Sequence, residues 1–163
     1  MSTDIKTMYQ QSLRNTHAAE RQGLTEMQAQ VEGLGDYPDY AALLRRHIAT
    51  TEGQIARLDA AMAAADVGGA GLREAVTTAA GAIGAAVHGI MPDATLKNLY
   101  AGYAYQHEQI AAYQSLAVIA EAAGHGAHRG WIEQSIAEER AAAQEVEALI
   151  EPVTRAFIAK NGD

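Results

Sequence analysis

Cysteine is absent from the 163 residues, and basic residues are scarce. Without cysteine the chain has no disulfide, no thiolate metal ligand and no cysteine nucleophile. Twelve lysine and arginine residues stand against twenty aspartate and glutamate residues, which gives a formal charge of −8. Because nucleic-acid backbones and anionic membranes both attract clustered positive charge, we expect neither as a partner.

Long hydrophobic runs are also lacking. The N-terminus has no apolar stretch behind a basic region, so we predict no secretory signal and expect a cytoplasmic protein. Residues 75–91 are apolar on average, but they consist mostly of alanine and glycine and include Thr77, Thr78 and His88. This composition favours a packed helix over a membrane span.

Only three prolines interrupt the chain, and no run of alternating β-branched residues predicts a strand. Alanine, glutamine and glutamate are abundant and favour helix. The length suits one domain with a full core. We therefore predict a single all-α domain over residues 1–163.

Helical periodicity and breakers divide the chain into four long segments and one short one. The expected helices run from Ser2 or Thr3 to Glu32, with Thr3 as N-cap, from about Pro38 to just before Asp66, and over residues 72–90, 94–123 and 127–159. Asp93 is the expected N-cap of the fourth helix, and Pro152 should kink the last one. Short turns join the first two and the last two long helices, with a long crossover between these pairs. This arrangement predicts two antiparallel hairpins and the ferritin-like version of the four-helix bundle.

Polar residues interrupt the apolar stripe of each long helix near its middle. In an antiparallel hairpin, residues equally far from the turn lie at one level: Glu20 precedes Gly35 by fifteen residues and so faces position 50. In the same way, Gln109 precedes His125 by sixteen residues and faces position 141. We therefore predict one interior polar cluster, whose members are Glu20, His47, Thr50 or Thr51, Gln106, Gln109 and Glu138 or Glu139, with His107 at its margin.

Two interpretations of this cluster remain open. One is a metal site, since ferritin-like centres combine glutamates from two helices with Glu-x-x-His pairs from the other two. The chain contains no such helical Glu-x-x-His pair, and glutamine is a neutral, weak ligand. The other interpretation is a hydrogen-bonded layer, in which Glu20 and Glu139 pair with His47, glutamine amides or the hydroxyls of Tyr103 or Tyr113.

Several stretches together resemble the YciF-like ferritin-like proteins, a bacterial group associated with stress responses. They include Gln106-His107-Glu108-Gln109-Ile110-Ala111-Ala112-Tyr113, Ala18-Ala19-Glu20, His47 with Thr50, Thr51 and Gln54, and Ser135-Ile136 with Glu138-Glu139. The resemblance extends from about Met8 to Phe157. It implies a dimeric bundle whose metal ligands would fall at Glu20, His47, positions 50, 106 and 109, and the Glu138-Glu139 pair. Here Thr50, Gln106 and Gln109 stand where that pattern carries glutamates.

Three hypotheses for function follow. The first is a stress-associated protein with a degenerate di-iron site, no bound cofactor and a structural or interaction role rather than an enzymatic one. The second is an iron-binding protein or oxidase with a reduced site, which holds weakly bound iron or another divalent metal through Glu20, His47, His107, Glu138 and Glu139. The third is a bundle that binds a small molecule, in which the tyrosine-rich fourth helix lines the pocket.

Overall fold

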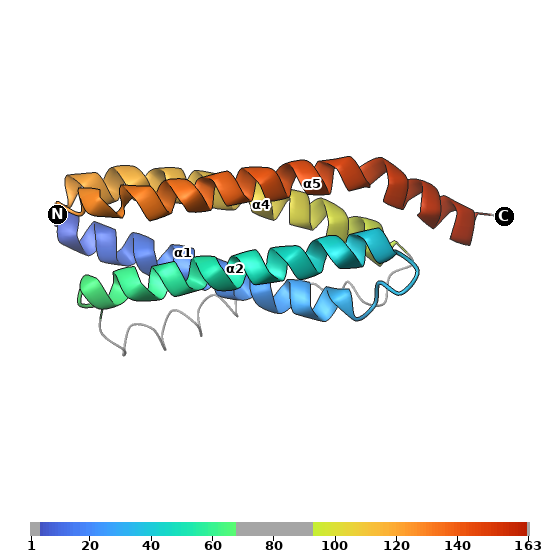
Figure 1. Ribbon diagram of the computed structural model, residues 1–163, viewed down its shortest axis with the longest axis horizontal. Coiled ribbons are helices and arrows are strands. Elements are labelled where there is room, and N and C mark those ends of the chain that lie inside the picture. The colour runs from blue at the N-terminus through green and yellow to red at the C-terminus, as the bar shows by residue number, and fades with distance from the viewer. Residues whose placement is uncertain (1–3, 68–92, 163) are drawn as a thin grey trace.

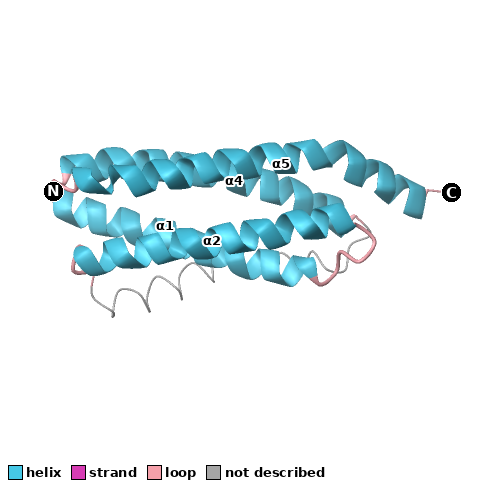
Figure 2. Ribbon diagram, viewed as in Figure 1, coloured by secondary structure: helices cyan, strands magenta, loops and turns pink. Residues whose placement is uncertain are grey.

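Four long helices form the part of the chain that the structure, a computed structural model, describes, namely residues 4–67 and 93–162. They are α1 (Ile5–Val31), α2 (Pro38–Ala64), α4 (Ala94–Ala122) and α5 (Arg129–Asn161), with a short 3₁₀ turn, η2, over Gly126–His128. Within these ranges there is no strand (Figure 2). The predicted all-α bundle is confirmed, whereas the expected helix over residues 72–90 lies outside the described residues.

The bundle consists of two antiparallel hairpins laid side by side (Figure 1). α1 packs on α2 and α5 packs on α4, and the hairpins meet where α1 contacts α4 and α2 contacts α5. α2 begins at Pro38, where the missing N–H is tolerated because first-turn N–H groups have no helical partner. α5 contains Pro152, and its last turns extend beyond the ends of the other helices (Figure 1), where Lys160 forms an ion pair with Asp36 of the α1–α2 turn.

The helix ends differ from the prediction only in detail. α1 begins at Ile5 with Asp4 in the N-cap position, so the assignment of Thr3 as N-cap was wrong. α4 ends in a Schellman motif, since the N–H of His125 donates to the carbonyl of Ala120 at 2.8 Å and that of Gly124 to Glu121 at 3.0 Å. Gly124 has φ +82°, a left-handed conformation that glycine adopts without a steric penalty.

The apolar core is divided into two clusters. The first joins the start of α1 and α5 to the ends of α2 and α4 and includes Tyr9, Leu13, Leu58, Leu116 and Ile132. The second lies toward the other end of the bundle and includes Met27, Tyr40, Leu44, Leu99 and Val146. On every long helix, buried polar residues lie between these two sets, and together they form a polar layer across the middle of the bundle.

Candidate functional site

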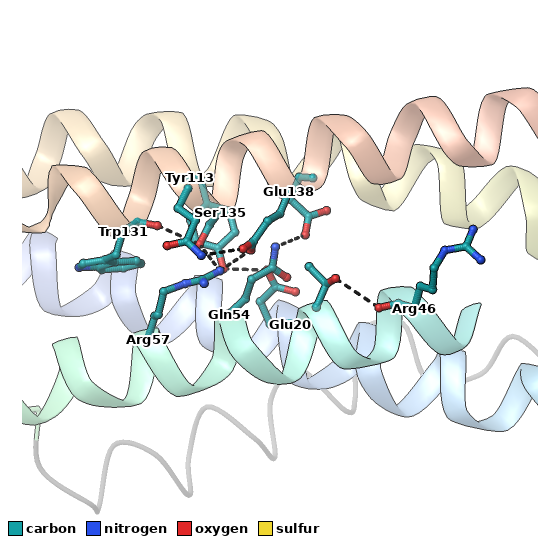
Figure 3. A network of polar contacts seen from close by, with 11 residues as sticks. Glu20, Arg46, Gln54, Arg57, Tyr113, Trp131, Ser135 and Glu138 are labelled. Atoms are coloured by element: carbon teal, nitrogen blue, oxygen red, sulfur yellow. Dashed lines mark hydrogen bonds and ion pairs between the residues drawn. The ribbon is translucent and has the colours of Figure 1, made fainter. Parts of the chain in front are cut away.

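The polar layer draws buried side chains from all four long helices. Its members are Thr16, His17 and Glu20 of α1, His47, Thr51 and Gln54 of α2, Gln106 and Gln109 of α4, and Ser135 and Glu139 of α5. Four of them, among them Glu20 and Gln109, have no solvent-accessible surface. Figure 3 shows part of this layer, with Glu20, Gln54 and Tyr113 directed into the space between the hairpins.

Glu20 is held by two tyrosine hydroxyls from α4. Tyr105 donates to one carboxylate oxygen at 2.7 Å, and Tyr113 donates to the other at 2.8 Å. The ring of Tyr105 reaches Glu20 across Gly23, where a Cβ atom would overlap the ring and lie 2.8 Å from its Cε2 atom. Glycine at this position therefore allows α4 to place a tyrosine over α1.

Glu139 is the second carboxyl group of the layer, and it is bound from α2. Gln54 Nε2 donates to Glu139 Oε1 at 2.7 Å. Next to this pair, Arg57 donates to Ser135 Oγ at 3.1 Å and forms an ion pair with Glu138 (Figure 3). α2 and α5 are thus joined across the layer by side-chain hydrogen bonds rather than by apolar packing.

Burial changes the protonation of these carboxyl groups. It raises the pKa of Glu20 to about 7, although the hydroxyls of Tyr105 and Tyr113 act in the opposite direction. Burial, reinforced by the charge of Glu20, raises the pKa of Glu139 to about 8. Because each charge disfavours the other, the layer retains protons at neutral pH that exposed carboxyl groups release.

His47 of α2 and Gln106 of α4 lie together in the wall of a small slot between α1 and α4, which residues of α2 and α5 also line. The slot has a volume of about 30 Å³, and Gly23, Tyr40, Gly102 and Tyr105 are among its other lining residues. Both ring nitrogens of His47 and the amide oxygen of Gln106 are buried without a hydrogen-bond partner among the described residues. His47 Nε2 lies 3.8 Å from a Glu145 oxygen, which is too long for a hydrogen bond.

The donor set does not match a di-iron centre. Such a centre takes four carboxylates and two histidines, whereas the interior layer supplies the carboxyl groups of Glu20 and Glu139 and the single unpaired histidine His47. Within residues 4–67 and 93–162, no group of three or more histidine, aspartate and glutamate side chains is arranged to hold a metal ion. Gln106 and Gln109 bring no charge to offset two divalent cations.

The structure corrects the prediction for His107 and decides between the alternatives left open at Thr50 or Thr51 and at Glu138 or Glu139. His107 is exposed on the outer face of α4, where its ring contacts that of Tyr103, so it does not border the layer. Thr50 is half-buried and donates to the carbonyl of Arg46 at 3.2 Å, whereas Thr51 is the buried neighbour. Glu138 lies at the edge of the layer, where it forms an ion pair with Arg57, and Glu139 is the buried member of this pair of glutamates.

Reasoning from the sequence missed Tyr105, Gln54, Arg57 and Ser135. Gln54 could have been found, because it continues the buried spacing of His47, Thr51 and Leu58 on α2. Tyr105 gives no such signal, since it is only half-buried and reaches the layer through the notch at Gly23. Tyr113 was correctly predicted as a partner of the interior carboxyl groups, and Tyr103 was not one.

The chain matches a known family along almost its whole length. A family model described as "Domain of unknown function (DUF892)" matches residues 4–159. Among solved structures, the chain resembles the crystal structure of a protein from Xanthomonas campestris pv. campestris, with a TM-score of 0.77 and 22% sequence identity. The match covers 96% of this chain and 97% of that one. At this identity the likeness shows a common fold.

Proposed function

Because this chain belongs to the DUF892 family, we propose that it is a YciF-like, ferritin-like protein whose di-iron position has become a hydrogen-bonded polar layer. Its role is structural or interactive within a stress response, and it forms a homodimer. The observation that carries this proposal is the hydrogen bonding of the two interior carboxyl groups. Glu20 accepts hydrogen bonds on both oxygens, and Glu139 accepts one from Gln54.

Charge supports the same conclusion. A hard divalent cation prefers ionised carboxylates, whereas the raised pKa values keep Glu139 largely protonated and Glu20 about half protonated at neutral pH. Binding two such ions would require loss of these protons and displacement of the tyrosine hydroxyls from Glu20. The neutral amides of Gln106 and Gln109 would offset neither cost.

A second candidate is an iron-binding protein or oxidase with a single, altered site. The observation that favours it is the set of buried acceptors without partners in the described chain, which includes the His47 nitrogens, Glu139 Oε2 and the side-chain oxygens of Gln54 and Gln109. These atoms could bind one divalent cation if local rotamers change. The two candidates therefore differ in whether stoichiometric metal binds at all.

Metal analysis separates the two candidates. We expect protein purified without chelator to hold far less than one iron per chain, and Fe²⁺ to leave its melting temperature unchanged. Stoichiometric iron that is lost in the Glu20→Ala/Glu139→Ala double variant would refute the degenerate site. Sedimentation equilibrium of the same preparation tests the homodimer, and a monomer at micromolar concentration would contradict that part of the proposal.

Restoring charge should restore affinity. The double variant Gln106→Glu/Gln109→Glu adds two carboxylates to the layer, and we expect it to bind Fe²⁺ at least about tenfold more tightly than the wild type. The matched control is Gln28→Glu/Gln114→Glu, which adds the same charge at exposed positions of α1 and α4. If both double variants bound Fe²⁺ with equal affinity, the proposal that the polar layer occupies the position of a metal site would be refuted.

A further inference from the structure

The slot between α1 and α4 has the features of a small-molecule site. Two buried polar side chains, His47 and Gln106, line it with unpaired atoms, although each is at least 95% buried. A buried polar group without a partner costs about 1–3 kcal/mol, so two such groups in one wall favour a bound molecule that pairs with them. This slot lies beside the Glu20 and Glu139 pairs but uses different unpaired atoms.

The polar atoms that line the slot favour a ligand that donates hydrogen bonds. The unpaired oxygen of Gln106 can only accept a hydrogen bond, and a neutral His47 ring has one nitrogen that accepts. Glu26 adds a carboxylate to the lining, and no lysine or arginine is among the lining residues. The rings of Tyr40 and Tyr105 complete a wall of the kind that attracts cations.

We propose that this slot binds a small organic cation through an ammonium or guanidinium head group, which donates N–H bonds to His47 and Gln106. The volume of about 30 Å³ limits the enclosed part to a few heavy atoms. The lining disfavours anions, because Glu26 is acidic and no lysine or arginine is present to pair with a negative charge. The inference extends the proposed function, since it assigns a ligand to the layer, but it does not require iron to be absent.

Access to the slot is set by small residues. Gly102 of α4 lines it, and a Cβ atom at this position would meet nothing within 4 Å. A leucine there has room for its Cβ atom and adds side-chain volume at a lining position, so we expect it to narrow the slot. Gly102→Leu is therefore the variant that should block the slot. We expect it to fold, because it replaces a glycine in a helix interior, where glycine is destabilising by roughly 0.5–1 kcal/mol relative to alanine.

Titration with methylguanidinium chloride tests the proposal. We expect saturable shifts of the ring-proton NMR signals of His47 at millimolar concentration, with sodium acetate and sodium chloride at equal ionic strength producing none. Gln106→Leu and Gly102→Leu should each weaken binding at least about tenfold. The control is His17→Gln, because His17 is equally buried but bonds Asp59 at 2.9 Å and does not line the slot.

Three results would overturn the proposal. They are the absence of a saturable shift in the wild type, an equal shift with acetate, and an unchanged affinity for methylguanidinium in a Gly102→Leu variant whose melting temperature equals that of the wild type. Saturation by Zn²⁺ without any response to methylguanidinium would likewise replace the organic cation with a metal. The two tests can be told apart, because the Glu20→Ala/Glu139→Ala double variant removes two candidate metal ligands but leaves His47 and Gln106, whereas Gly102→Leu changes the slot but leaves both carboxyl groups.

Discussion

Two carboxyl groups buried in the polar layer should make the bundle less stable as the pH rises above neutrality. Burial raises the pKa of Glu139 from an ordinary 4.5 to about 8, and that of Glu20 to about 7. Between the unfolded and the folded pKa the native state binds more protons, so the free energy of unfolding falls with rising pH. The free energy of unfolding stops falling once the pH exceeds the pKa values that the two groups have in the folded state.

The size of this effect follows from the two pKa values. Each pH unit between the unfolded and folded pKa costs about 1.4 kcal/mol. From about pH 6.5 to 8, Glu139 alone therefore removes about 2 kcal/mol, and Glu20 adds a smaller amount below its own pKa of about 7. A domain of this kind has a total stability of about 5–15 kcal/mol, so the change is readily measured.

Urea unfolding followed by circular dichroism at several pH values tests this prediction. Glu139→Gln keeps an acceptor for Gln54 but has no proton to lose at this position. Its free energy of unfolding should therefore fall with pH only by the smaller amount that Glu20 contributes, and at high pH it should exceed that of the wild type by about 2 kcal/mol. Glu147→Gln is the matched control, because it removes an exposed carboxyl group from the same helix. A wild-type curve that is level between neutral and alkaline pH, or one that Glu139→Gln leaves unchanged, would refute the assignment of buried, protonated carboxyl groups.

Two further substitutions test the contacts of Glu20. Gly23→Ala places a methyl group against the ring of Tyr105 and should destabilise the protein by about 1–3 kcal/mol in thermal unfolding. The control is Gly53→Ala, whose methyl group meets nothing within 4 Å and should stabilise the protein by about 0.5–1 kcal/mol. Equal effects of the two would argue against the close approach at Gly23. Tyr113→Phe removes a donor that favours the ionised form of Glu20, so the pKa of Glu20 should rise further and the loss of stability at alkaline pH should grow by about 1–2 kcal/mol. Urea midpoints that stay parallel to the wild type across the pH range would contradict this.

The α4 segment shows where sequence reasoning was least secure. Its apolar residues are distributed around the whole helix, so periodicity did not decide which face is buried. Gln109 was predicted inside the interior cluster and is fully buried, whereas its apolar neighbour Ile110 is only partly buried. His107 was predicted at the margin of the cluster and is exposed.

The sequence by itself determined the helices, the two hairpins and the level of the polar layer. These follow from local signals, such as Pro38 at a helix start and Gly124 at a helix end, and from counting along antiparallel neighbours. Glu20 and Glu139 were identified in this way because each interrupts an otherwise apolar stripe. Local periodicity and turn chemistry are read from short stretches of chain, and no distant contact is needed to interpret them.

Only the tertiary structure decided how the polar layer is paired. Tyr105 bonds Glu20 because Gly23 lets α4 approach α1, and Arg57 turns inward because Ser135 and Glu138 face it from α5. Each pairing depends on the rotation of one helix against another, which a one-dimensional pattern does not fix. The unpaired atoms of His47 and Gln106 likewise became visible only when the slot between the helices was defined.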